Sequence, residues 1–372
     1  MPLRVLIVPD KFKGTLTAPQ AATAIAQGWS ETRPQDRLEI LPMADGGDGF
    51  GEVLGALLQA ERRTCETVDA AGRPRTAEWW WQPETGVAVL ETAQVIGLAL
   101  LPPGHYHPFQ LDTFGIGEVL RAAEQAGARR LYLGIGGSAT NDGGFGLARA
   151  LGWTFRDASG AELKLWTGLD SLAAAAPPAN PLRIPQLIIA VDVANPLLGF
   201  KGATGIYGPQ KGLRADELPK AEGCLRRLAD VLRTRTGLAA ELEPGAGAAG
   251  GLGYGLKVFA GGVFQSGAAI FATLSRLEER IRQADLVVTA EGALDAQSLM
   301  GKGVGFVAGL AARAGRRCLC LAGTVSITPQ EAPWRDFQAL AIVPGIAALS
   351  ESKTRAAACL RRLAAHAAGL LP

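Results

Sequence analysis

The chain has 372 residues, 48% of them hydrophobic, and a formal net charge of only +2. Without a block of basic residues and with few aromatic side chains, it is unlike a protein that binds nucleic acid. No run reaches the ~18 apolar residues that a membrane-spanning helix needs, so we predict no membrane partner. At ~100–200 residues per domain, this length indicates two domains.

The numbers and spacing of the cysteines and histidines argue against a zinc site. The five cysteines are odd in number and include no CxxC pair, so we expect reduced thiols, a cytoplasmic location and no zinc site. The apolar run near the N-terminus is about six residues long and predicts a strand, not a signal peptide. Two of the three histidines, His105 and His107, lie in a PPGHYHPF loop, where we expect them to be solvated or hydrogen-bonded.

Short apolar runs that are rich in Val, Ile and Leu and bounded by turn residues predict buried strands. They lie at residues 4–10, 38–45, 130–137, 186–193, 284–292, 318–323 and 339–345. Helical patterns lie at residues 18–29, 115–126, 304–314 and 352–368. Before the first of these helices, Thr17 and Gln20 have the spacing of a capping box. Alternating strands and helices indicate an α/β fold with a largely parallel sheet.

Residues 63–90 depart from this alternation. They read as three short strands joined by AAGR and PETG turns, which predicts an antiparallel piece and the start of a second domain. Within it, Trp79–Trp81 are expected to pack in the core and at the sheet edge. The strand–helix rhythm returns near Ala284. We therefore predict a first α/β domain from residues 1–62 and 283–372, with a mixed α/β domain of residues 63–282 inserted into it.

Five predicted strands end in a carboxylate or in a Gly-rich turn. In parallel α/β sheets, ligands bind beyond the carboxyl ends of the strands. One such Asp is explained equally well as a helix cap, but five such ends together predict a site that meets cations or a metal. The acidic and amide residues at these ends are Asp10, Asp45, Asp48, Asn141, Asp142, Asp192, Asn195, Glu291 and Asp295.

The lysines are few, and their neighbours are unusual. Only nine occur, against 28 arginines, and four of the nine precede a glycine: Lys13, Lys201, Lys211 and Lys302. A lysine that binds phosphate as a point charge gains from an adjacent glycine, because the backbone must also approach the anion. The alternative for each lysine taken alone is a solvated turn.

The stretch LGIGGSATNDGGFGLARALG, Leu133–Gly152, is the richest in glycine and small polar residues. It predicts a turn that leaves a strand and enters a helix near Phe145, with bare N–H groups suited to phosphate. The chain has no GxxxxGK[ST], and its one GxGxxG match, Gly245–Gly250, does not follow a strand. A second Gly-rich segment, residues 247–255, is expected to lie over the same cleft. Together with the carboxylates and lysines, these features favour phosphoryl transfer.

Six motifs resemble, in the same order, the serial motifs of the type I bacterial glycerate kinases. They are VPDKFKGTLTA, PMADGGDGF, GIGGSATNDGGFG, DVANPLLGFKGATGIYGPQKG, GAGAAGGLGYGL and TAEGALDAQSLMGKGV, spanning Val8 to Val304. The resemblance implies an ATP-dependent kinase that uses Mg²⁺ and phosphorylates D-glycerate, at the 2-hydroxyl, to 2-phosphoglycerate. It also implies a flavodoxin-like domain with an inserted α/β domain and the active site in the cleft between them.

Residue roles follow from the strand-end positions and the resemblance together. We expect Asp192 to accept the proton of the glycerate hydroxyl or to orient it, and Lys13 and Lys302 to act with it in catalysis. The expected substrate- and nucleotide-binding residues are Asp10, Gly46, Gly47, Gly136, Gly137, Ser138, Thr140, Asn141, Asp142, Asn195, Lys211, Glu291 and Gln297. The expected metal ligands are Asp45, Asp48 and Asp295.

The chain departs from the family motifs at a few positions. Lys11 stands where the family has Ser, and Ala194 stands where an Asp is common, which favours Asp192 as the base. Ala293 replaces an Arg, which removes one partner for a carboxylate or a phosphate.

Other functions remain open at this point. They are a kinase of another small sugar acid, a non-catalytic sugar-acid sensor and a dinucleotide-dependent oxidoreductase. The sequence also leaves open whether the chain forms a homo-oligomer.

Overall fold

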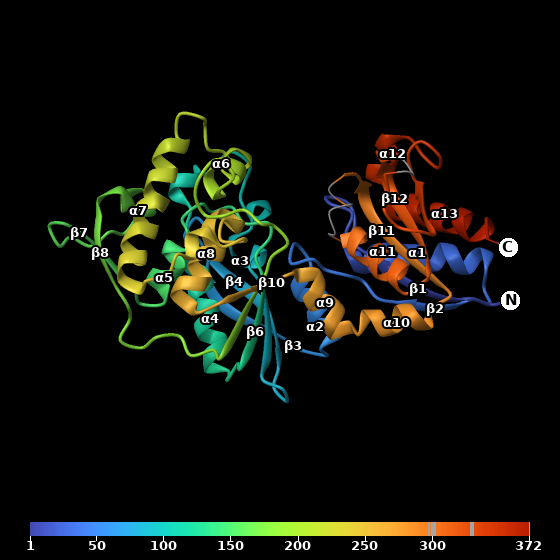
Figure 1. The fold of residues 1–372 in the computed structure, drawn as a ribbon, viewed down its shortest axis with the longest axis horizontal. Coiled ribbons are helices and arrows are strands. Elements are labelled where there is room, and N and C mark those ends of the chain that lie inside the picture. Colours follow the sequence, from blue (N-terminus) through green and yellow to red (C-terminus); the bar gives the residue numbers. More distant parts are fainter. Residues whose placement is uncertain (297, 299–302, 328–330, 372) are drawn as a thin grey trace. The chain divides into compact units, whose positions relative to one another are not determined.

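The computed structural model describes residues 1–296, 298, 303–327 and 331–371 (Figure 1). The chain forms two compact units. Unit 1 combines Met1–Asp45 with Ala268–Pro372, and unit 2 is Gly46–Gly267. In the sequence, unit 2 is therefore one continuous segment inserted between the two segments that form unit 1.

Unit 1 is built on a five-stranded sheet whose neighbouring strands are all parallel. Its strands are, in spatial order, β2 (Arg37–Ile40), β1 (Arg4–Pro9), β11 (Leu286–Leu294), β12 (Arg317–Val325) and β13 (Phe337–Ala341). Counted within this unit, the order is 2-1-3-4-5, which is the order of flavodoxin-like sheets. The sheet confirms the predicted parallel α/β architecture.

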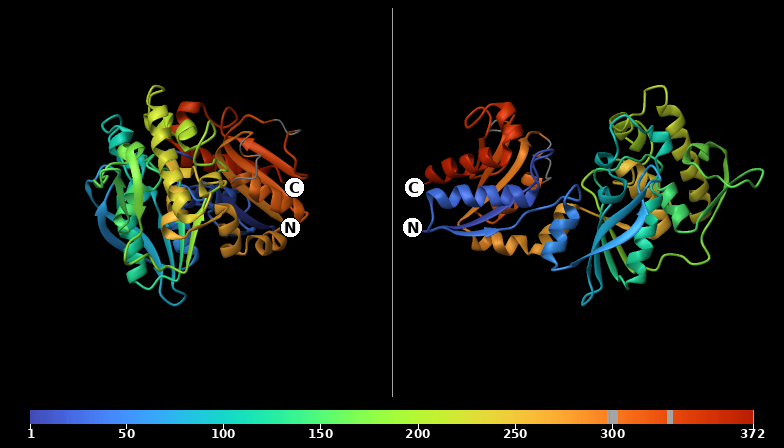
Figure 2. Two further views of the ribbon diagram at one scale, coloured as in Figure 1. Left: turned by 60° about the vertical axis from the view of Figure 1, so that its left-hand side comes forward. Right: turned by 180° about the vertical axis from the view of Figure 1, so that it is seen from behind.

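Helices cover both faces of this sheet. On one face, α1 (Ala18–Thr32) and α13 (Ala356–Gly369) share a core with β1, β11 and β12, and the two helices lie side by side (Figure 2). They meet so closely that a Cβ on Gly28 would lie 2.0 Å from the carbonyl oxygen of Arg361. On the other face, α11 (Gly303–Arg313) packs with Cys320 and Ala322 of β12.

The remaining helices of unit 1 are short. They are α9 (Gly267–Ser275), α10 (Leu277–Gln283) and α12 (Leu349–Thr354). The predicted capping box of α1 is confirmed, because Thr17 and Gln20 exchange hydrogen bonds between side chain and backbone N–H. The predicted single helix over residues 352–368 is instead two helices, since the backbone of Arg355 is not helical (φ −131°).

Unit 2 contains a mixed six-stranded sheet in the order β10-β9-β6-β5-β4-β3. The strands β3, β4 and β5 form the predicted antiparallel piece, whereas β5, β6, β9 and β10 are parallel. In chain order the strands are β3 (Glu61–Val68), β4 (Pro74–Gln82), β5 (Val87–Glu91), β6 (Arg130–Gly134), β9 (Gln186–Ala190) and β10 (Val263–Gln265). A separate hairpin consists of β7 (Thr154–Asp157) and β8 (Leu172–Ala176).

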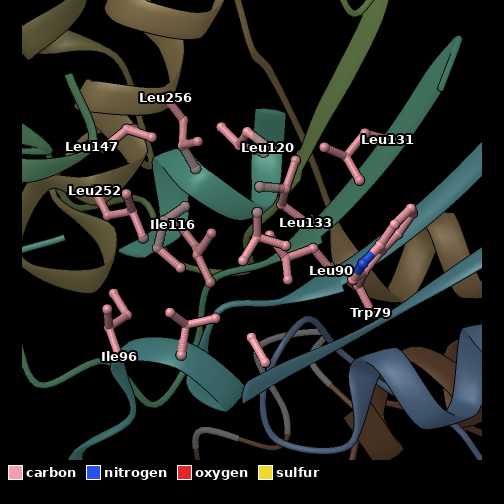
Figure 3. Close-up of a cluster of buried hydrophobic side chains, with 14 of the residues drawn as sticks. Trp79, Leu90, Ile96, Ile116, Leu120, Leu131, Leu133, Leu147, Leu252 and Leu256 are labelled. Atoms are coloured by element: carbon pink, nitrogen blue, oxygen red, sulfur yellow. The ribbon is translucent and has the colours of Figure 1, made fainter. Parts of the chain in front are cut away.

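The helices of unit 2 pack on this sheet or on one another. They are α2 (Phe50–Leu57), α3 (Ala93–Ile96), α4 (Phe114–Gln125), α5 (Phe145–Ala150), α6 (Ala203–Tyr207), α7 (Leu218–Thr236) and α8 (Ala248–Ala260). In the main core, leucines of β5 and β6 meet side chains of α4, α5 and α8 (Figure 3). A second core holds most of α7 together with Phe155 and Trp166.

The three consecutive tryptophans of β4 are all buried, as predicted. Trp79 and Trp81 point into the main core. Trp80 lies on the opposite face, against α2, where a Cβ on Gly51 would be 1.9 Å from its ring. This packing places α2 in unit 2, so the units divide at residues 45/46 and 267/268, whereas the sequence analysis divided them at 62/63 and 282/283.

The contact between Gly51 and Trp80 gives a stability prediction. A Gly51→Ala substitution overpacks this contact and should lower the free energy of unfolding by about 1–3 kcal/mol. The matched control is Gly223→Ala in α7, where the described residues leave a Cβ free space within 4 Å. That change should stabilise the protein by about 0.5–1 kcal/mol, because Ala favours helix over Gly. Thermal unfolding should show a lower midpoint temperature than wild type for Gly51→Ala and a higher one for Gly223→Ala. Equal midpoints for the two variants would contradict the packing argument.

Candidate active site

The predicted strand-end residues divide between the two sheets. Asp10 and Asp295 follow strands of unit 1, Glu291 lies within the last part of β11, and Asp45 closes the first stretch of that unit. The other strand-end residues, Asp48, Asn141, Asp142, Asp192 and Asn195, belong to unit 2. The five strand ends that the sequence analysis treated as one group therefore form two groups, one at each sheet.

The group in unit 1 consists of Asp10, Asp45, Glu291 and Asp295, which we call the carboxylate cluster. Burial raises the pKa of Glu291 to about 7, and the negative charges of the other three members act in the same direction. A hydrogen bond with Ser298 opposes the shift. A buried carboxylate whose pKa is raised further by neighbouring negative charges is a favourable place for a cation.

One oxygen of this cluster has no hydrogen-bond partner within the described part of the chain. The Oε1 atom of Glu291 is buried and has no hydrogen-bond partner among the described residues. Leaving a buried acceptor unsatisfied costs about 1–3 kcal/mol, so such an atom calls for an explanation such as an ion. The acidic donor set and this unpaired oxygen fit a hard cation such as Mg²⁺.

Lys11 contacts this cluster although it was not among the predicted site residues. Its Nζ lies 3.1 Å from Oδ1 of Asp45, and its backbone N–H donates to Oδ1 of Asp10 at 2.7 Å. The side chains of Lys11 and Asp45 are only 22% and 26% exposed. Its position directly after Asp10 was the available signal, but the sequence analysis recorded Lys11 only as a departure from the family motif.

The structure places the remaining predicted residues of unit 1 as follows. Lys13 is exposed in the turn after β1. Lys302 and Gln297 lie outside the described residues, so their predicted roles stay predictions. No three His, Cys, Asp or Glu side chains in the described ranges form a ready-made metal cage. Mg²⁺ does not require one, since it usually binds one or two carboxylates together with water and substrate phosphates.

The group in unit 2 centres on Lys211, which ends a 3-10 turn, η4 (Pro209–Lys211). Although it is a lysine, Lys211 is only 8% exposed. Its Nζ donates to Oγ of Ser138 at 2.9 Å and to the carbonyl oxygen of Thr140 at 2.5 Å. Burial lowers the pKa of Lys211 to about 7, while the charge of Asp142 opposes this shift. The ammonium group of Lys211 is thus buried and meets neutral oxygens of Ser138 and Thr140. Because burial disfavours its positive charge, the site suits an anion, which would stabilise that charge.

The lowered pKa of Lys211 predicts a dependence of stability on pH. The unfolded chain keeps this proton up to about pH 10.5, whereas the folded chain releases it near pH 7. Between these values the unfolded state binds more protons, so this residue makes the free energy of unfolding rise with pH. Relative to a Lys211→Met variant, the wild type should gain stability from pH 7 to 10. Urea unfolding followed by tryptophan fluorescence measures the difference, and a constant difference would contradict the prediction.

Two further buried oxygens belong to the loop whose Thr140 carbonyl accepts the hydrogen bond from Lys211. Thr140 and Asn141 are fully buried, and the amide nitrogen of Asn141 donates to Oγ1 of Thr204 at 3.1 Å. In the part of the chain that the structure describes, Oγ1 of Thr140 and Oδ1 of Asn141 have no hydrogen-bond partner. We call Ser138, Thr140, Asn141 and Lys211 the Lys211 cluster.

Asp142, which was predicted to bind substrate or nucleotide, is also fully buried. Its Oδ2 accepts hydrogen bonds from the N–H and the hydroxyl of Thr113 and from the N–H of Gly146, at 2.8–3.0 Å. Its Oδ1 accepts one from the N–H of Gly144 at 3.2 Å. Asp142 thus joins the starts of α4 and α5, and both of its oxygens are occupied within the chain.

The glycines after Asp142 serve the packing of α8. The N–H of Gly143 donates to the carbonyl oxygen of Gly250 at 3.1 Å. A Cβ on Gly144 would lie 2.6 Å from Cα of Gly255, and one on Gly250 would lie 1.9 Å from the carbonyl oxygen of Thr140. The two Gly-rich segments are therefore adjacent in unit 2. The N–H groups of Gly143, Gly144 and Gly146 are bonded within the chain, so at these glycines the backbone makes room for another backbone.

The loop of Gly46, Gly47 and Asp48 lies beside the other half of the Gly-rich stretch. The N–H of Gly136 donates to the carbonyl oxygen of Gly46 at 3.1 Å. A Cβ on Gly137 would lie 2.6 Å from Oδ1 of Asp48. The structure thus groups Asp48 with unit 2, and the predicted metal ligands Asp45 and Asp48 belong to different units.

Asp192 and Asn195 follow β9 in unit 2. Asp192 is half-buried two residues beyond the strand, which agrees with its expected strand-end position. The amide nitrogen of Asn195 donates to the carbonyl oxygen of Lys201, and its Oδ1 accepts from the hydroxyl of Tyr207, both at 2.7 Å. Asn195 therefore ties the loop after β9 to α6, while Lys201 itself is exposed.

Unit 1 has carboxylates near the strand ends of a parallel sheet, and unit 2 has a buried lysine beside a Gly-rich turn, a combination typical of α/β enzymes that bind ligands at strand ends. Comparison with known proteins agrees. The model of the glycerate kinase family matches residues 5–372. The chain is 35% identical to the glycerate kinase of Halalkalibacterium halodurans, covering 98% of this chain and 97% of that protein. It is 36% identical to the glycerate 2-kinase of Escherichia coli K12, covering 87% and 86%.

A solved structure extends the match to the fold. The crystal structure of a Salmonella typhimurium LT2 protein assigned as glycerate kinase 2 superimposes with a TM-score of 0.83 at 32% identity, covering 99% of this chain and 98% of that chain. The chain belongs to the glycerate kinase family, and it is an enzyme of the kinase class. The resemblance seen in the motifs is thereby confirmed. No helix in the described residues has the length and apolar character that crossing a membrane requires.

Proposed function

We propose that this chain is an ATP-dependent kinase that phosphorylates D-glycerate at the 2-hydroxyl and yields 2-phosphoglycerate. The observation that supports it most is the relation to the Escherichia coli glycerate 2-kinase, since the alignment covers most of both chains. The two groups of charged residues have the chemistry that phosphoryl transfer needs, namely carboxylates for a cation and a lysine for an anion. The free cysteines accord with a cytoplasmic location.

In this proposal the carboxylate cluster holds Mg²⁺ through Glu291, with Asp10 and Asp295 beside it. When bound, the ion supplies positive charge that offsets the negative charge of the phosphates. Asp45 is engaged with Lys11, and we therefore assign it to orienting the cluster. Asp48 belongs to unit 2, and its assignment as a metal ligand rests on the sequence alone.

The Lys211 cluster binds an anionic group of the substrates in this proposal. Lys211 provides the positive charge, and Ser138 provides a hydroxyl at its side. Asp192, beyond the end of β9, orients the attacking hydroxyl of glycerate. Lys13 lies on an exposed turn, and we assign it to binding phosphate. Lys302 receives the same role from the sequence alone.

A direct product analysis tests the function. Purified protein is incubated with MgATP and D-glycerate, and the product is resolved by phosphorus NMR. A 2-phosphoglycerate signal that requires both ATP and Mg²⁺ is the expected result. A 3-phosphoglycerate signal would keep the kinase and overturn the position of transfer. Binding of glycerate without turnover would favour the sensor over the kinase.

A further inference from the structure

The segment that carries Lys211 is short and held in a fixed turn. The N–H groups of Lys211 and Leu213 both donate to the carbonyl oxygen of Gly208, at 3.1 and 3.0 Å. Gly212 has a φ of +106°, a left-handed conformation that favours glycine. The direction of the Lys211 side chain toward Ser138 depends on the conformation of this turn, and therefore also on the residues outside the turn that contact it.

Glu217, the residue before α7, fixes the end of the turn. Its Oε2 accepts the backbone N–H of Arg214 at 2.9 Å, and its Oε1 lies 2.6 Å from Nη2 of the same arginine. Its side chain is only 12% exposed. Both carboxylate oxygens of Glu217 are thus engaged by Arg214, which lies three residues beyond Lys211.

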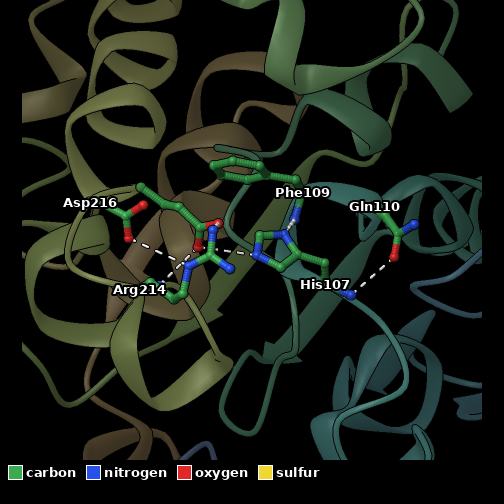
Figure 4. Close-up of polar contacts among 6 residues, drawn as sticks. His107, Phe109, Gln110, Arg214 and Asp216 are labelled. Atoms are coloured by element: carbon green, nitrogen blue, oxygen red, sulfur yellow. Dashed lines mark hydrogen bonds and ion pairs between the residues drawn. The ribbon is translucent and has the colours of Figure 1, made fainter.

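His107 binds this carboxylate from a loop that is 110 residues away in sequence. Its Nε2 lies 3.1 Å from Oε2 of Glu217, and its Nδ1 accepts the backbone N–H of Phe109 at 3.3 Å (Figure 4). Because Nδ1 is an acceptor, Nε2 carries the proton and donates it to Glu217. The loop also lies close to the turn, since a Cβ added to Gly212 would be 3.7 Å from the ring of Pro108.

We propose that His107 is a positioning residue for the kinase reaction, which through Glu217 and Arg214 holds the turn that aims Lys211 at Ser138. This role rests on the proposed function of Lys211 as an anion ligand. Loss of the His107 hydrogen bond leaves the Glu217–Arg214 contact in place, so we expect the turn to loosen without unfolding. The effect should fall on substrate binding more than on the chemical step, because Lys211 remains present but is less well aimed.

The test combines kinetics with a double-mutant cycle. In His107→Ala, KM for the substrate whose anion Lys211 binds should rise about five- to twentyfold, with kcat within about twofold of wild type. His107→Gln, which retains an N–H donor, should restore part of the loss. In a Lys211→Met background the His107→Ala change should add less than about twofold, because the lysine to be aimed is gone. The matched control is His105→Ala, an exposed residue of the same loop whose ring contacts Tyr106.

A spectroscopic readout separates this proposal from the proposed function. The side-chain NMR resonance of Lys211 should shift in His107→Ala and stay in place in His105→Ala, whether or not glycerate is phosphorylated. An unshifted resonance, an unchanged KM or fully additive effects in the cycle would each overturn the positioning role. Failure of the wild type to phosphorylate glycerate would overturn the function alone. Thermal unfolding of each variant confirms that the compared proteins are folded.

Discussion

Replacement of Lys211 by Met should lower kcat/KM by about 10²-fold or more. Hydrogen bonds from a charged group are worth roughly 1.5–3 kcal/mol, and every 1.4 kcal/mol is tenfold. Met keeps the length and the apolar stem of the side chain but removes the ammonium that meets Ser138 and the Thr140 carbonyl. Steady-state kinetics with MgATP and D-glycerate provides the measurement.

A matched control shows whether the loss of activity is specific to Lys211 or follows from removing any lysine charge. Lys164→Met removes an exposed lysine of the same unit and should retain wild-type kinetics. Lys211→Arg should remain impaired, because a buried site shaped for a compact ammonium does not fit the planar guanidinium. A Lys211→Met enzyme within about threefold of wild type would show that the buried lysine serves structure alone.

The second large effect is expected for Glu291→Gln. This change keeps the shape of the side chain and removes one negative charge from the carboxylate cluster. If Glu291 holds Mg²⁺, kcat should fall by about 10²- to 10³-fold and the Mg²⁺ concentration for half-maximal rate should rise, since electrostatic groups of this kind commonly contribute several kcal/mol. Rates measured across a Mg²⁺ titration give both quantities.

The control for Glu291 is Glu279→Gln in α10, an exposed carboxylate of the same unit. It should leave both the rate and the Mg²⁺ dependence unchanged. A Glu291→Gln enzyme that is slow but has the wild-type Mg²⁺ dependence would contradict the metal role. In that case the unpaired Oε1 atom would need another partner, such as an ordered water.

The sequence was sufficient to predict much of the fold because the decisive signals were local. Apolar runs bounded by turns predicted strands, and each proved to contain one, from Arg4–Pro9 to Phe337–Ala341. Thr17 and Gln20 predicted the start of α1 because a capping box is contained in four residues. The hairpins of β3, β4 and β5 were likewise set by turn residues between short strands.

Features that depend on contacts between distant residues could not be predicted in this way. Nothing in the local sequence shows that Gly144 faces Gly255, so a turn that accommodates another backbone looked like a turn that accommodates phosphate. The pairing of His107 with Glu217 is equally non-local. In the sequence, Asp142 looked like a ligand because it stands in a Gly-rich turn. The N–H groups that donate to its carboxylate, those of Thr113 and Gly146, come close to it only when the chain folds.

The interrupted course of unit 1 has a consequence for how the protein is made. The strand β1 lies between β2 and β11, but residues 46–267 are synthesised before β11. At ~5–20 residues per second, the ribosome needs roughly ten to fifty seconds for that interval. Pulse-labelled nascent chains should therefore show protease resistance in unit 2 before unit 1. Until β11 emerges, the apolar strand β1 has one unpaired edge, so the newborn N-terminus is the part of this protein most in need of a chaperone.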